Sequence, residues 1–149
     1  MKVQCSTIVP GTVSEVFSRF DRSLFEALKP PGMPMRLDRY DGNAAGDRIH
    51  VTIGAPLLPQ RWESVIVERG QSANECFFVD EGRILPFPLK YWRHVHRVRS
   101  AGEQVEIIDD IDFRTAIRPL DPLMWLLIAL MMNLRRPVYR SFFGSKAGA

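Results

Sequence analysis

The sequence predicts a single α+β domain over 1–149, in which a curved, seven-stranded antiparallel sheet wraps around a long C-terminal helix. A length of 149 residues with 46% hydrophobic content suits one globular domain with one sizeable core. Seven segments alternate apolar and polar residues, which is typical of strands with one buried face. The uncharged apolar run 122–134 predicts a helix about 20 Å long, too short to cross a hydrocarbon core of ~30 Å.

The N-terminal part of the chain is expected to form one strand and two short helices. The strand covers 2–9, where apolar and small residues alternate with others until a Pro-Gly pair ends it. Thr12 and Glu15 have the spacing of a capping box, so the first helix begins after Thr12. Asp21 or Ser23 starts the second helix, and a Lys-Pro-Pro-Gly run ends it because proline cannot continue the hydrogen-bond ladder.

The rest of the chain is expected to form an up-and-down sheet followed by one helix. Short polar or glycine-containing turns separate the strands, as in a series of hairpins. The expected strands are 35–40, 48–53, 60–69, 75–81, 90–99 and 104–115. Asp121 is expected to cap the final helix, with Pro122 at its first position, where the missing N–H costs nothing.

The loops at one end of this sheet are unusually apolar. Alternate connections of an up-and-down sheet emerge at the same end, and at one end every connection combines proline with large apolar residues. These connections are 30–34, 55–59, 84–89 and 117–120. Because loops normally face water and are polar, this end is either the rim of a pocket or a plug of loops packed on one another.

The order strand, two helices, six strands and helix resembles the helix-grip fold of the START-related superfamily, often labelled SRPBCC. That superfamily includes birch-pollen-allergen-like proteins and polyketide cyclases. The resemblance is carried by VPGTVSEVF at 9–17, LPQRW at 58–62, FPLKYWRH at 87–94 and DDIDFR at 109–114. It implies a hydrophobic cavity, between the sheet and the final helix, for a lipid-, polyketide- or aromatic-like molecule. No catalytic signature can be carried over, so the implied role is binding without catalysis and without a cofactor.

Two neighbouring strands direct a histidine and an aspartate to the same face of the sheet. Because side chains alternate between faces, His94 and His96 point the same way, and Asp109 points with the apolar residues of its own strand. Pairing Val98 with Val105 across the glycine turn places His94 opposite Asp109. The outer face then pairs arginines with acids, which supports this register.

Three interpretations of this inward cluster stay open. His94 and Asp109 form a structural pair or orient a ligand, since a buried carboxylate needs a partner. Alternatively, Asp109 orients His94 as the acid or base of a cyclase- or dehydratase-type enzyme, which makes these two the candidate catalytic residues. A metal bound by His94, His96 and Asp109 is the third. No metal is expected, because all three ligands would come from a single hairpin.

A ligand cavity is expected between this face and the final helix. The candidate ligand-binding residues are Leu58, Trp62, Phe87, Trp92, His94, His96, Asp109, Ile111, Phe113, Leu127 and Met131. Segment 123–134 lacks the polar stripe that a helix packed on one sheet should show. This helix is therefore either deeply buried or presents an apolar outer face to a membrane surface or a second subunit.

Composition argues against several other classes of protein. The net charge is only +3, and the arginines are scattered among acids rather than gathered in the basic stripe of a nucleic-acid-binding protein. Cys5 and Cys76 lack the spacing of a zinc site. The first residues lack the apolar run of a secretory signal, so a cytoplasmic location is expected. We therefore expect a hydrophobic small molecule, not a nucleic acid, as the partner.

Overall fold

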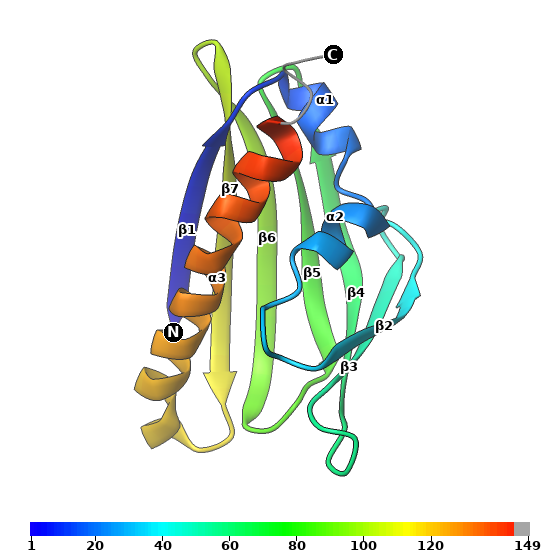
Figure 1. Cartoon of the computed structure of the whole chain (residues 1–149), viewed down its shortest axis with the longest axis vertical. Coiled ribbons are helices and arrows are strands. Elements are labelled where there is room, and N and C mark those ends of the chain that lie inside the picture. Colours follow the sequence, from blue (N-terminus) through cyan, green and yellow to red (C-terminus); the bar gives the residue numbers. More distant parts are fainter. Residues whose placement is uncertain (145–149) are drawn as a thin grey trace.

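A computed structural model describes residues 1–144 and shows a curved antiparallel sheet with one long helix across its open side (Figure 1). The seven strands lie in the order β1-β7-β6-β5-β4-β3-β2. They are β1 Lys2–Val9, β2 Met35–Tyr40, β3 Arg48–Ile53, β4 Gln60–Gln71, β5 Glu75–Ile84, β6 Leu89–Ala101 and β7 Gln104–Thr115. The helices are α1 Val13–Ser18, α2 Arg22–Ala27 and α3 Asp121–Gly144, which follows the 3-10 turn Arg118–Leu120. The predicted fold class is confirmed.

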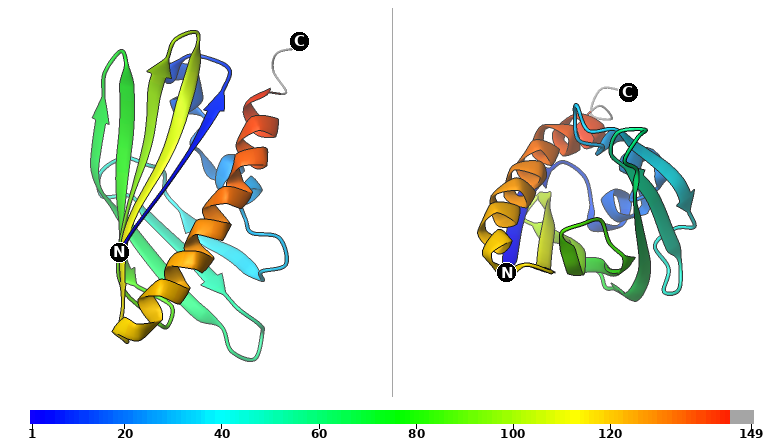
Figure 2. Two further views of the ribbon diagram at one scale, coloured as in Figure 1. Left: turned by 90° about the vertical axis from the view of Figure 1, so that its left-hand side faces the viewer. Right: turned by 90° about the horizontal axis from the view of Figure 1, so that it is seen from below.

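The sheet bends so strongly that its inner face forms a trough. Figure 2 shows α3 running diagonally over the open side of this trough, with α1 and α2 beside it. Strand β1 pairs with β7, which brings the first and last strands together at the edge nearest α3. As a result, α3 covers one half of the inner face directly, while α2 stands over the other half.

The predicted pairing of β6 with β7 is wrong by two residues. Val98 lies opposite Ile107 rather than Val105. Both strands continue up to a two-residue turn, in which Gly102 has a φ of +69°, a left-handed conformation that favours glycine. The small residues before this glycine stay in the strand, so the turn is tighter than the sequence suggests.

A shift of two residues leaves every side chain on its predicted face, because the side chains of a strand alternate with a period of two. His96, not His94, therefore lies directly opposite Asp109. His94 lies opposite Ile111 and reaches Asp109 diagonally, with 2.9 Å between His94 Nε2 and Asp109 Oδ1. The inward histidine–aspartate contact forms, although by a different pairing.

The short helices begin where the sequence predicts. The Thr12 hydroxyl accepts a hydrogen bond from the Glu15 N–H, and the Glu15 carboxylate accepts one from the Thr12 N–H. Asp21 caps α2 by accepting from a backbone N–H in its first turn. Asp121 behaves differently from expectation, because its carboxylate accepts hydrogen bonds from the N–H and the hydroxyl of Thr115. It ties the end of β7 to the start of α3.

Thr12→Ala is expected to lower the free energy of unfolding by about 1 kcal/mol, because it removes the oxygen that accepts the Glu15 N–H. Thr12→Ser keeps the hydroxyl and should cost clearly less. Urea denaturation followed by circular dichroism measures both variants. Equal losses would show that the capping box contributes nothing to stability.

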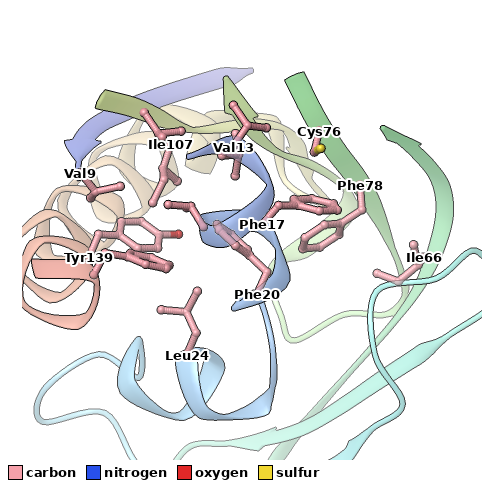
Figure 3. Packing of buried hydrophobic residues seen from close by; sticks show 14 residues of the cluster. Val9, Val13, Phe17, Phe20, Leu24, Ile66, Cys76, Phe78, Ile107 and Tyr139 are labelled. Atoms are coloured by element: carbon pink, nitrogen blue, oxygen red, sulfur yellow. The ribbon is translucent and has the colours of Figure 1, made fainter. Parts of the chain in front are cut away.

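The trough buries two apolar clusters. The larger one joins α1 and the start of α2 to the upper part of the sheet and to the C-terminal half of α3. Figure 3 shows Phe17, Phe20 and Phe78 of this cluster grouped beside Leu24 and Tyr139. The smaller cluster lies under the N-terminal half of α3. Its buried members are Val3, Cys5, Trp92, Ile111, Phe113, Ile128 and Met132. Between them, the clusters hold α3 along its length.

Helix α3 buries one face and exposes another that is also apolar. Ile128 and Met132 are buried, whereas the outward face carries large exposed side chains. These are Leu123, Leu126, Leu127, Leu130 and Leu134. Deep burial therefore does not explain the missing polar stripe. None of the helices in the described part of the chain is long and apolar enough to span a membrane.

The apolar loops gather at the end of the sheet where α3 begins, the lower end in Figure 1. Their tips are in contact with solvent, since Leu57 is 93% exposed, Leu58 80% and Phe87 66%. Tips so exposed do not pack on one another, which argues against a plug.

Candidate functional site

A cavity of about 130 Å³ lies between the sheet, α2 and the middle of α3. Most of its walls are apolar, contributed by α2, by the loop before β2, by strands β2 to β6 and by two methionines of α3. Polar side chains gather mainly on the inner face of the central strands. They include Ser64, Asp80, His94, His96 and, from α3, Arg135. A polar group is thus available on one wall of an otherwise apolar space.

The structure brings only some of the predicted ligand-binding residues to this cavity. Those that line it are Trp62, Trp92, His94, His96 and Met131. Those that do not are Leu58, Phe87, Asp109, Ile111, Phe113 and Leu127. Among the four apolar loops, the loop before β2 contributes lining residues, Pro30 and Met33.

The position of α3 explains this division. Helix α3 lies along β1 and β7, so its side chains fill the space above the inner face of β7. Ile111 and Phe113 on β7 have no exposed surface and pack in the smaller apolar cluster. Leu127 points to the outer face of α3 and is 44% exposed. Free space remains over β2 to β6, where α3 contributes only one edge of the wall, through Met131, Met132 and Arg135.

Asp80 is a site residue that is not among those predicted from the sequence. It lies on β5 opposite His94 and is only 7% exposed. The signal for it was present, because Cys76 and Phe78 are apolar and share its face of the strand. An acid that continues such an apolar alternation is directed into the core.

The two histidine rings stack between two carboxylates. Their centroids lie 3.7 Å apart with the planes tilted by 34°. On one side, Asp109 Oδ1 lies 2.9 Å from His94 Nε2 and 3.3 Å from His96 Nδ1. On the other side, Asp80 Oδ2 lies 3.0 Å from His96 Nε2 and 3.7 Å from His94 Nδ1. Each imidazole therefore stands between both carboxylates.

Further side chains hold the two carboxylates in place. The Tyr139 hydroxyl donates to Asp109 Oδ2 at 3.2 Å, and the Arg135 guanidinium lies 3.8 Å from Asp109 Oδ1. Ser64 hydrogen-bonds to Asp80 and accepts a hydrogen bond from the Trp62 indole N–H at 3.1 Å. Asp109 thus contacts the histidines without lining the cavity, whereas Asp80 lines the cavity wall.

Burial and charge act against each other in this cluster. Burial works to raise the pKa of both Asp80 and Asp109, but their contacts with the histidines outweigh it and lower both values, that of Asp109 well below its usual range. Burial, together with the charge of His96, lowers the pKa of His94. Burial also works to lower the pKa of His96, but its contacts with Asp109 and Asp80 prevail and raise it. The raised pKa favours the protonated form of His96, which together with Arg135 offsets the two carboxylate charges.

Two tyrosines near the cavity remain protonated. Burial and the charge of Asp109 raise the pKa of Tyr139 well above its usual value, so its hydroxyl stays a donor. Burial and the charges of Asp21 and Asp47 raise the pKa of Tyr40 to about 12. The remaining histidine, His50, lies away from the cluster, with its Nε2 3.8 Å from a carboxylate oxygen of Glu63.

Comparison of sequences finds no match to a protein-family model and none to a curated protein. Comparison of structures does find similar folds. A START superfamily protein from Mycobacterium smegmatis is 7% identical, with a TM-score of 0.67 over 97% of each chain. Truncated norcoclaurine synthase from Thalictrum flavum is 9% identical, with a TM-score of 0.64 over 93% of this chain and 91% of that one.

A third similar structure is major latex-like protein 151 from Panax ginseng. It is 13% identical, with a TM-score of 0.62 over 93% of this chain and 95% of the other. Identities this low establish a shared fold and leave the ligand open.

Proposed function

We propose that this chain, which shares the helix-grip fold of START superfamily proteins, binds a small apolar molecule that carries one polar group. The observation behind the proposal is the cavity itself, which has mostly apolar walls and a polar wall formed by Ser64, Asp80, His94, His96 and Arg135. Binding sites for small molecules typically combine mostly apolar lining with a few placed polar groups. Burial of apolar ligand surface contributes about 25 cal/mol per Å², and the polar wall orients the ligand.

The size and charge of the cavity narrow the class of ligand. A cavity on the order of 150 Å³ admits a benzene-sized molecule, so about 130 Å³ suits a single ring or a short chain. The charges of the cluster already balance, and a neutral ligand leaves that balance unchanged. A hydroxyl or N–H on the ligand would donate to Asp80, whereas a carboxylate would be repelled by it. We therefore expect a neutral aromatic or aliphatic alcohol to bind better than the corresponding acid.

The tryptophans of the chain provide the test. Trp62 and Trp92 meet edge to face at 4.7 Å and line the cavity, whereas Trp125 is 40% exposed on α3. In a Trp125→Phe background, fluorescence therefore reports on the cavity. We expect para-bromophenol to quench it saturably and para-bromobenzoate to quench it much more weakly.

Two further substitutions check that the quenching arises in the cavity. Ile53 lines the cavity, so Ile53→Phe should fill part of it and weaken para-bromophenol binding severalfold. Leu58→Phe, a similar change at an exposed loop tip, should leave binding unchanged. Quenching that rises linearly with concentration, or that both variants leave unaffected, would contradict the proposal.

A further inference from the structure

We propose that Asp80, His94 and His96 bind a divalent transition-metal ion such as zinc on the polar wall of the cavity. One donor atom from each of the three residues lies within 4.8 Å of the others. Asp80 Oδ2 lies 3.0 Å from His96 Nε2 and 3.7 Å from His94 Nδ1. A tetrahedral ion with ligand bonds of 2.0–2.2 Å spaces its donors by about 3.3–3.6 Å, so the two distances from Asp80 need only small side-chain shifts. The metal site shares a wall with the cavity but does not depend on an apolar ligand.

The position of Asp109 is the strongest argument for a metal. A metal-binding histidine directs one ring nitrogen to the ion and almost always donates the other N–H to a carboxylate or carbonyl. Asp109 Oδ1 lies 2.9 Å from His94 Nε2 and 3.3 Å from His96 Nδ1, which are the nitrogens opposite the proposed donors. When the ion binds and displaces the proton shared with Asp80, this one carboxylate would keep the remaining protons on His94 Nε2 and His96 Nδ1, so that His94 Nδ1 and His96 Nε2 bind the metal.

His96 Nδ1 supports the same assignment. This atom is buried, and among residues 1–144 it makes no hydrogen bond of good geometry, although Asp109 Oδ1 is near. A metal on Nε2 would keep the proton on Nδ1 and direct it to Asp109, which accounts for an otherwise unsatisfied buried nitrogen.

Residues around the cluster hold the two carboxylates from their far sides. Tyr139 donates to the Asp109 oxygen that does not contact the histidines, and Arg135 approaches the same side chain from α3. Ser64 hydrogen-bonds to Asp80 and is in turn held by the Trp62 indole N–H. Such outer contacts orient metal ligands, and a divalent cation suits a buried group of two carboxylates beside one arginine.

The proposed ligands also come from suitable elements. Asp80 lies on β5 and both histidines on β6, two paired strands in the middle of the sheet, so their backbones are rigid. All three residues line the cavity, which leaves the open side of the ion facing it. Three protein donors with an open position are typical of sites where water or a ligand oxygen completes the coordination. The three ligands again come from one hairpin, β5 and β6, but Asp80 and His94 face each other across it, which brings the donor atoms together.

The test uses the whole protein after treatment with EDTA and dialysis. Zinc is titrated by calorimetry, and Co²⁺ is followed by visible absorption. We expect one ion per chain at micromolar concentration, with a cobalt spectrum typical of nitrogen and oxygen ligands. Mg²⁺ and Ca²⁺ should not compete, since they prefer ligand sets made only of oxygen. Absence of zinc binding, or equal competition by Mg²⁺, would overturn the proposal.

Substitutions test which side chains bind the zinc ion. Asp80→Asn and His96→Gln keep the side-chain size, and we expect each to weaken zinc binding at least 10-fold. Asp109→Asn should weaken it about 10–100-fold through the histidines. His50→Gln is the matched control and should have no effect, because His50 lies outside the cluster. Unchanged affinity in the folded Asp80→Asn and His96→Gln variants would refute the assignment.

Nuclear magnetic resonance of the unmodified protein gives the same answer without variants. With ¹⁵N-labelled histidine, zinc should shift the ring nitrogens of His94 and His96 and leave those of His50 in place. A shift confined to His50 would overturn the proposal. Para-bromophenol quenching is measured separately on the metal-free protein, so the metal site and the apolar-ligand proposal can fail independently.

Discussion

Phe113→Ala is expected to lower the free energy of unfolding by about 3–5 kcal/mol, the largest effect of any single change considered. The Phe113 ring has no exposed surface and packs in the smaller apolar cluster with Trp92 and Met132. Its removal loses apolar burial and leaves a void under α3, because a β-strand and a helix held by other contacts cannot close the gap fully. Urea denaturation followed by circular dichroism measures the loss.

Phe87→Ala is the matched control for this change. Phe87 lies at a loop tip and is 66% exposed, so its truncation should alter stability by no more than about 0.5 kcal/mol. The sequence predicts both phenylalanines to be ligand-binding residues, and neither lines the cavity. A small loss in Phe113→Ala, comparable to that in Phe87→Ala, would contradict the position of Phe113 in the core.

His94→Ala is expected to lower the free energy of unfolding by about 2–4 kcal/mol. His94 is 3% exposed and lies 2.9 Å from the Asp109 carboxylate, which would lose one of its partners. Asp109 keeps contacts with His96, Tyr139 and Arg135, so the loss should stay below that of an entirely unpaired buried charge. Thermal and urea unfolding of the metal-free protein measure it.

His50→Ala controls for the removal of an imidazole as such. His50 contacts Glu63 at 3.8 Å outside the cluster, and its truncation should cost no more than about 0.5 kcal/mol. The double variant His94→Ala with Asp109→Ala should cost less than the sum of the single changes, because the two residues interact directly. Strict additivity of the two losses in unfolding free energy would show that the His94–Asp109 contact contributes nothing to stability.

Local patterns in the sequence account for the elements of the fold. Alternation of apolar residues identifies the strands, and the Thr12–Glu15 spacing locates the start of α1, which the structure confirms. Such signals depend on residues close together in the chain, so they need no knowledge of what packs above them. The same logic explains why a register error of two residues leaves His94, His96 and Asp109 on the correct face.

The amino-acid sequence alone therefore predicts the set of elements, their order and the side chains that point inward. Which inward side chains line a cavity and which pack against a helix depends on the packing of α3 against the sheet. Helix α3 lies over β1 and β7, so Phe113 becomes core, whereas Asp80 on β5 stands beside free space together with the histidines. The partners Arg135 and Tyr139 come from the second half of α3, and Tyr139 lies 30 residues from Asp109 in the chain. The reason is physical: the path of a helix across a sheet depends on how both surfaces pack together, and no short segment of sequence encodes that fit.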